Sequence, residues 1–144
     1  MSISAKLLAA VLARDKGKCA ECGLDCRRIE RKLRRMQDAV RRPGTVEGYD
    51  VLDVRINWLF QYRERLRKRG FDMGSKRARF AILAPVKRLW QVHHVQERVI
   101  GGDDSVANLL TLCRPCHARE TADLNHAQAR GKRMTPRCYS GKEK

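Results

Sequence analysis

The amino-acid sequence predicts an α+β fold that is mostly helical, with a small two-stranded unit in its last third. Two observations predict this class. In the first two thirds of the chain, apolar residues recur at intervals of three and four, which is typical of helices that bury one face. From residue 89 onward, two short apolar segments flank a glycine-rich loop and precede a helix-like stretch, so we expect a strand, a loop, a second strand and a helix.

The length of 144 residues is that of one domain. We expect a single domain over residues 1–144, built from four consecutive parts. These are a helix and a first cysteine turn at 1–26, a basic helical insertion at 27–88, a core with two strands, a helix and a second cysteine pair at 89–130, and a basic tail at 131–144.

The first helix is predicted over residues 4–16. Ser4 can cap its N-terminus, because a serine oxygen accepts hydrogen bonds from the first backbone N–H groups of a helix. Gly17 can end it. A tight turn that carries Cys19 and Cys22 follows directly. The apolar stripe of this helix consists of Leu7, Leu8, Val11 and Leu12.

The insertion is strongly basic, with 19 Lys or Arg against 7 Asp or Glu over residues 27–88. One helical stripe runs over 29–40, and Pro43 interrupts it. A second stripe runs over 52–66. We expect these two helices to fold back on each other with their Arg-rich faces outward. A third, short helix is predicted over 74–84.

The last third of the chain changes from helical to alternating patterns. Strands are predicted over 89–95 and 109–112, with a loop at 101–104 between them and a helix over 114–130 after them. The tail from residue 131 is basic, and we expect it to be loose.

The formal net charge is +16 at pH 7 and the pI is about 10.3. An excess this large disfavours cationic or neutral partners and indicates a polyanion. The longest apolar run, residues 7–13, is too short to cross a membrane, and no cleavage site follows it. We therefore expect a cytoplasmic protein, in a bacterial host cell or encoded by a phage, that has no membrane partner.

The cysteines predict a structural zinc site. Four of them form two Cys-x-x-Cys pairs, Cys19 with Cys22 and Cys113 with Cys116. Two such pairs supply the four sulfurs of a tetrahedral zinc shell. The 90 residues between the pairs are no obstacle. Lengthening a closed loop from ~20 to ~90 residues costs about 1.3 kcal/mol, whereas structural zinc contributes on the order of 10 kcal/mol.

Some of these cysteines could instead be ordinary buried thiols. Cys26 is a rival to Cys22 for a place in the zinc shell, and Cys138 lies in the tail. We expect both to be bystanders.

Three of the four histidines are candidates for a functional site. His93 and His94 are adjacent in a predicted strand, so their side chains point to opposite faces and have different surroundings. His117 follows Cys116 at the start of the last helix, where it and one of the pair can converge on a second metal ion. The other histidine can then act as a base near neutral pH. The alternative is a set of satisfied core or surface residues, which is how we interpret His126.

Three stretches of the sequence together resemble the HNH endonuclease family. The first is the lead-in at 11–23, which carries the first cysteine pair. The second is Trp-Gln-Val-His-His-Val at 90–95, and the third is Asn-Leu-Leu-Thr-Leu-Cys-Arg-Pro-Cys-His at 108–117. The resemblance covers residues 5–26 and 88–126 but not the insertion. A compact chain of this kind resembles the members found in phages and in bacterial defence or mobile elements.

This resemblance implies a ββα-metal fold and hydrolysis of DNA phosphodiester bonds with one divalent metal ion. It makes His94 the general base that activates water, and His117 and His93 the ligands of the catalytic metal. Asn108 would pin the loop that orients His94, and the four cysteines would hold structural zinc. His93 stands where many members have Asp, so we expect the site to favour Mn²⁺, Ni²⁺, Co²⁺ or Zn²⁺ over Mg²⁺.

Four arginines are candidates for contact with nucleic acid: Arg63, Arg67, Arg114 and Arg119. Their alternative role is that of solvated surface residues, and the basic helices could also dock to a protein partner such as phage packaging machinery. We expect DNA as the partner and a monomeric chain. The rival functional class is a non-catalytic zinc module that binds nucleic acid or a protein. Such a module needs the cysteines but not the three histidines.

Overall fold

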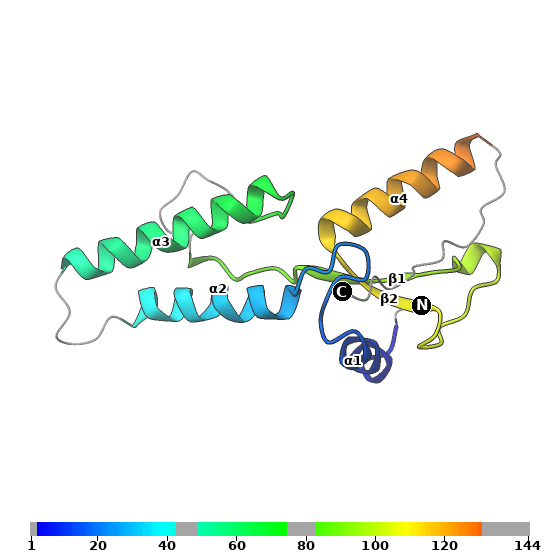
Figure 1. Cartoon of the computed structure of the whole chain (residues 1–144), viewed down its shortest axis with the longest axis horizontal. Helices are drawn as coiled ribbons and strands as arrows, with labels where there is room; N and C mark the ends of the chain where they lie inside the picture. The colour runs from blue at the N-terminus through cyan, green and yellow to red at the C-terminus, as the bar shows by residue number, and fades with distance from the viewer. Residues whose placement is uncertain (1–2, 43–48, 75–82, 131–144) are drawn as a thin grey trace. The chain divides into compact units, whose positions relative to one another are not determined.

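The computed structural model describes residues 3–42, 49–74 and 83–130 (Figure 1). The elements follow in the order α1 (Ala5–Arg14), α2 (Cys26–Arg41), α3 (Tyr49–Lys68), β1 (Trp90–His94), the 3₁₀ helix η2 (Arg98–Ile100), β2 (Leu109–Cys113) and α4 (Arg114–Ala129). This arrangement confirms the predicted α+β class. Within the described ranges, no helix is long and apolar enough to cross a bilayer.

The chain divides into two compact units. One unit consists of Met1–Cys26 with Trp90–Lys144, and the other consists of Arg27–Leu89. The boundaries fall where the composition changes from mixed to strongly basic and back.

The core of the first unit is the antiparallel pair β1–β2, with α4 following β2 without a break (Figure 1). The register places His93 opposite Leu110 and His94 opposite Leu109. Leu109 and Leu112 are fully buried, and because they point to opposite faces of β2, both faces of this strand are covered. Both predicted strands and the predicted last helix are confirmed to within one residue at each end. The short helix η2 in the connecting loop was not predicted.

The N-terminal helix α1 begins at the predicted cap. The Leu7 N–H donates to Ser4 Oγ at 3.2 Å, and Val11 in the apolar stripe is fully buried. Gly17 follows the helix in the left-handed region, with φ of 69°. The predicted helix and its cap are therefore confirmed, but the helix ends at Arg14, two residues before the predicted end, with Asp15 as its C-cap.

The end of α1 is tied to the second strand. Asp15 Oδ2 accepts the Thr111 N–H at 2.7 Å, and the Arg14 guanidinium donates to the Leu109 carbonyl at 2.5 Å. In the turn that follows, the Ala20 N–H donates to the Thr111 carbonyl at 2.8 Å. These contacts hold the turn that carries Cys19 and Cys22 beside β2.

In the second unit, α2 and α3 pack in antiparallel fashion. The Lys32 ammonium lies 4.6 Å from the centre of the Tyr62 ring, and the Arg55 guanidinium donates to the Ala39 carbonyl at 3.3 Å. The early part of α2 thus meets the late part of α3, which confirms the predicted pair of helices. The third predicted helix, at 74–84, falls largely on residues 75–82, which lie outside the described residues.

The arginines of this unit do not all face outward. Arg63 on α3 is only 5% exposed, and its guanidinium donates to the Met73 carbonyl. Phe71 and Met73, in the segment after α3, are also buried, and this segment brings the acceptor to Arg63. The expectation of outward Arg-rich faces is therefore wrong at Arg63. Its side chain is buried, because its guanidinium donates to a backbone carbonyl of the segment that follows α3.

The four predicted cysteines form one cluster. Their sulfur atoms all lie within 4.8 Å of one another: Cys19 and Cys22 from the turn after α1, Cys113 at the end of β2, and Cys116 in the first turn of α4. Four sulfurs in this arrangement are the ligand set of a structural zinc site. Cys26 is buried but lies outside the cluster, where its thiol donates to the Leu24 carbonyl at 3.6 Å. Cys138 lies outside the described residues.

The proximity of the sulfurs changes their ionisation. Donation from the Cys113 thiol lowers the pKa of Cys19 to about 4, and the same pairing raises the pKa of Cys113. Burial raises the pKa of Cys116 to about 12. The Arg119 guanidinium donates to Cys116 Sγ at 3.2 Å and to Glu21 at 2.8 Å. Thiolates this close repel one another, so full ionisation of the cluster requires a cation among them.

We expect Cys113→Ser to abolish zinc binding and most of the stability of the first unit. The metal contributes on the order of 10 kcal/mol in small zinc domains, and a serine hydroxyl does not replace a thiolate ligand. The measurements are zinc content by elemental analysis and the midpoint of thermal unfolding. Cys26→Ser is the matched control, because Cys26 is equally buried but outside the cluster. A zinc-free Cys113→Ser variant as stable as this control would show that zinc at the cluster does not stabilise the fold.

Candidate functional site

Two of the three candidate histidines face each other. His93 lies on β1 and His117 lies in the first turn of α4, with their ring centres 5.5 Å apart and their ring planes at 89°. Two imidazoles that bind one tetrahedral ion at about 2.1 Å have ring centres roughly 5 Å apart. The separation therefore suits a shared metal ion.

Both imidazoles are held in the neutral form that binds metals. Burial lowers the pKa of His93, which is only 6% exposed, and the same cause lowers the pKa of His117. The negative charge of Glu97 opposes this effect at both rings, and that of Glu120 opposes it at His93. A neutral imidazole keeps a lone pair for a cation at neutral pH.

A cavity of about 290 Å³ opens beside these rings. His93, His94 and His117 all line it, together with Glu97 and residues of the next turns of α4, among them Thr121. A water molecule takes about 30 Å³ in the liquid, so the cavity has room for a hydrated ion and part of a larger ligand. The polar lining gives such a ligand several hydrogen-bonding partners.

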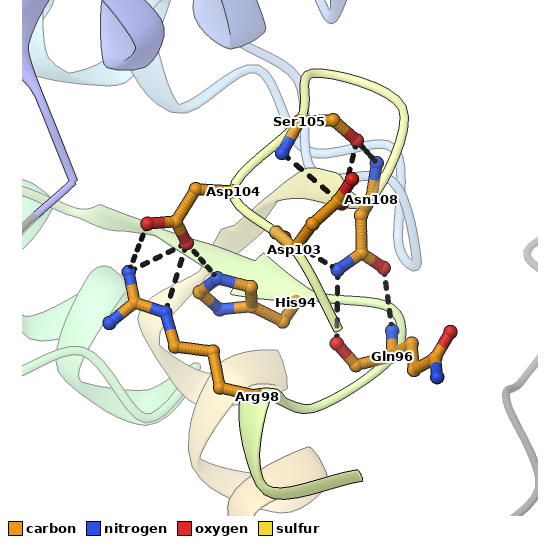
Figure 2. A network of polar contacts seen from close by, with 7 residues as sticks. All are labelled: His94, Gln96, Arg98, Asp103, Asp104, Ser105 and Asn108. Atoms are coloured by element: carbon orange, nitrogen blue, oxygen red, sulfur yellow. Dashed lines mark hydrogen bonds and ion pairs between the residues drawn. The ribbon is translucent and has the colours of Figure 1, made fainter. Parts of the chain in front are cut away.

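His94 has different partners from its neighbour. Its Nε2 lies 2.8 Å from Asp104 Oδ1, and the Arg98 guanidinium lies 2.6 Å from the same oxygen (Figure 2). The expected difference in surroundings is present, although both rings line one cavity. Sequence reasoning missed Asp104. An acidic residue in a glycine-rich loop carries no periodic signal, and only the path of the loop brings it to His94.

Asn108 closes the loop between the two strands. Its Oδ1 accepts the Gln96 N–H at 2.8 Å, and its Nδ2 donates to the carbonyls of Gln96 at 3.0 Å and Asp103 at 2.8 Å (Figure 2). One amide side chain thus joins the end of β1 to the residues that precede β2. The Val95 N–H adds a backbone bond to the Asn108 carbonyl at 2.8 Å.

Gly102 permits this closure. A Cβ atom at this position would lie 1.8 Å from the Gln96 carbonyl oxygen and 3.0 Å from Asn108 Nδ2. No side chain fits there without moving the backbone. Its neighbour Gly101 adopts φ of 89°, but no atom lies closer than 3.9 Å to a Cβ built there. The two glycines therefore serve different needs, close approach at Gly102 and a left-handed backbone at Gly101.

The four candidate arginines are not gathered around the cavity. Arg63 is buried, and Arg67 is paired with Glu64 on α3. Arg119 binds the cysteine cluster through Cys116. These three guanidiniums have partners within the protein, and their contact with DNA stays a prediction.

Arg114 differs from the other three. It is the first residue of α4, and its buried Nε has no hydrogen-bond partner among the described residues. Its charge is close enough to act on the pKa of His117. Of the four candidates, Arg114 is therefore the one near the histidines.

We expect Gly102→Ala to destabilise the protein by about 1–3 kcal/mol, as overpacking does in a tight site. The Gln96 N–H should also lose its protection from hydrogen exchange, because the new methyl group displaces the chain that holds Asn108. Urea unfolding and amide exchange measure the two effects. Gly101→Ala serves as control, since it adds backbone strain without the collision. Unchanged exchange at Gln96 in the Gly102 variant would contradict this account of the loop.

Comparison with known proteins gives one result. Residues 82–123 match the family model described as HNH endonuclease. Neither the curated proteins nor the solved structures give a match. The matched segment holds both strands, the loop with Asn108, the second cysteine pair and all three histidines of the cavity. The segment 82–123, which carries the candidate site, is therefore similar to the HNH endonuclease family.

Proposed function

We propose that this protein is an endonuclease that hydrolyses phosphodiester bonds in DNA, by nicking or cutting, with His94 as its general base. The observation that carries the proposal is the convergence of His93, His94 and His117 on one cavity within the HNH segment. An HNH nuclease domain implies a nucleic-acid substrate, and the net charge of +16 supports a polyanionic one.

His93 and His117 are the residues that would hold the catalytic metal. A divalent cation held by them would neutralise phosphate charge and stabilise the leaving oxygen. The donors are two neutral imidazoles, His93 buried and His117 half-buried, which favours Mn²⁺, Ni²⁺, Co²⁺ or Zn²⁺ over Mg²⁺. The cysteine cluster would hold a separate, structural zinc, because four sulfurs leave no open position for a substrate.

In this proposal His94 takes a proton from the attacking water. It lines the cavity beside the two proposed ligands, and a neutral imidazole is an effective base near neutral pH. The loop closed by Asn108 fixes the position of the residues around His94. This positioning matters because a displacement of about 1 Å can cost roughly a hundredfold in rate.

The exposed face of α2 would contact the DNA backbone. On this helix, Leu33 and Val40 are buried, whereas the basic side chains on the opposite face are exposed. Phosphate contacts of this kind hold the nucleic acid without reading its sequence. The exposed basic residues of this face are Arg27, Arg28, Arg31, Lys32, Arg34, Arg35 and Arg41.

We expect His94→Ala to slow the nicking of supercoiled plasmid by about 10²–10⁴-fold, the usual contribution of a general base. Zinc content and thermal stability should not change. The assay compares Mn²⁺, Mg²⁺, Ni²⁺, Co²⁺, Zn²⁺ and a chelator. His126→Ala is the matched control, because His126 lies exposed on α4 away from the cavity.

Two results would contradict the proposal. Cutting by His94→Ala at the rate of the control would show that His94 is not the base. Tight DNA binding by the wild-type protein without cutting, whatever the metal, would favour the non-catalytic zinc module.

The contact with DNA predicts a steep dependence of affinity on salt. Each phosphate contact adds about 0.9 to the slope of log K against log salt, so replacing Arg31, Arg34 and Arg35 together with Gln should reduce the slope by up to about 3. Fluorescence anisotropy with a labelled duplex measures it. The control replaces three exposed basic residues with Gln, two in the last turns of α3 and one directly after it: Arg65, Lys68 and Arg69. A flat dependence in the wild type, or an equal loss in both variants, would rule out a specific role for the α2 face.

A further inference from the structure

We propose that Asp104 is a positioning residue that sets the tautomer of His94. Its carboxylate accepts the Nε2–H of the imidazole and so leaves Nδ1 as the nitrogen that can take a proton from water. The inference rests on the proposed function, in which His94 is the base.

The distance between the two groups supports a hydrogen bond of defined direction. His94 Nε2 and Asp104 Oδ1 are 2.8 Å apart, and the His94 side chain is only 13% exposed (Figure 2). An ionised carboxylate has no proton to donate, so Nε2 must be the donor. In a neutral imidazole the other nitrogen then carries the lone pair.

Asp104 is itself held in place and kept ionised. The Arg98 guanidinium contacts both of its oxygens, with Nη2 at 2.6 Å from Oδ1 and 2.7 Å from Oδ2, and Nε at 2.9 Å from Oδ1. Hydrogen bonds from His94 and from Arg98 lower the pKa of Asp104. The guanidinium fork restricts rotation of the carboxylate, so its oxygen stays aimed at the imidazole.

The neighbouring carboxylate has a different task. Asp103 Oδ1 accepts the N–H of Ser105 at 3.2 Å and its hydroxyl at 2.8 Å, and the Asp103 carbonyl accepts from Asn108. Asp103 thus shapes the loop, whereas Asp104 joins the loop to His94 (Figure 2). The chain therefore offers a control of equal charge one residue away.

The direct test is the tautomer of His94, read from the ¹⁵N shifts of its imidazole. The full zinc-loaded chain is used without a second metal, at a pH where the ring is neutral. The wild type should show the Nε2–H form alone. Asp104→Asn should show a mixture, because a carboxamide can either accept from Nε2–H or donate to an unprotonated Nε2. Asp103→Asn should match the wild type, since an amide oxygen still accepts from Ser105.

Kinetics give the second readout. Asp104→Asn should lower kcat for plasmid nicking by about 10–100-fold with little change in KM, because the base is misoriented while DNA binding is intact. Asp103→Asn should stay within a few-fold of the wild type. Thermal unfolding of both variants shows whether either substitution merely loosens the loop.

The outcomes separate this inference from the proposed function. If His94→Ala loses activity but Asp104→Asn keeps both the wild-type tautomer and the wild-type kcat, only the role of Asp104 is overturned. If His94→Ala cuts normally, the proposed function fails and the positioning role fails with it. A mixed tautomer in Asp104→Asn together with a lower kcat supports the proposal.

Discussion

The close approach of four sulfurs is the constraint on which the site depends. It joins a turn near the N-terminus to the junction of β2 and α4, across 91 positions between Cys22 and Cys113. Cys116 and His117 are consecutive, so the same turn of α4 carries a member of the cluster and a member of the histidine pair. Fixing the cluster therefore fixes the start of α4 against the strands, and with it the distance from His117 to His93.

A second constraint acts at the other end of the sheet. The loop from β1 to β2 has little apolar burial of its own, and polar contacts determine its shape: the amide of Asn108, the close approach at Gly102 and the ion pair of Arg98 with Asp104. His94 lies between this network and the cavity. The proposed base is thus oriented by the loop, while the proposed metal ligands are oriented by the cysteine cluster. Two independent devices set the two halves of the site.

The sequence predicts most of the elements because their signals are local. Apolar periodicity predicts α1, α4 and both strands to within a residue or two, and cysteine spacing predicts the cluster, since two-residue gaps have few other uses in such a chain. What it does not predict depends on contacts between distant positions. Arg63 is buried because a later segment returns over α3, and Asp104 reaches His94 because of the particular path of a loop. Neither arrangement produces a periodic pattern in the sequence.

The separation of the insertion from the rest of the chain has an evolutionary consequence. Residues 27–89 form a compact unit with its own buried leucines and helix-to-helix contacts, while the sulfurs and histidines all belong to the other unit. Such a module can diverge, lengthen or be exchanged without altering the histidine cavity. In the proposed nuclease, selection can then change the affinity for DNA through this unit while the histidine site is inherited unchanged.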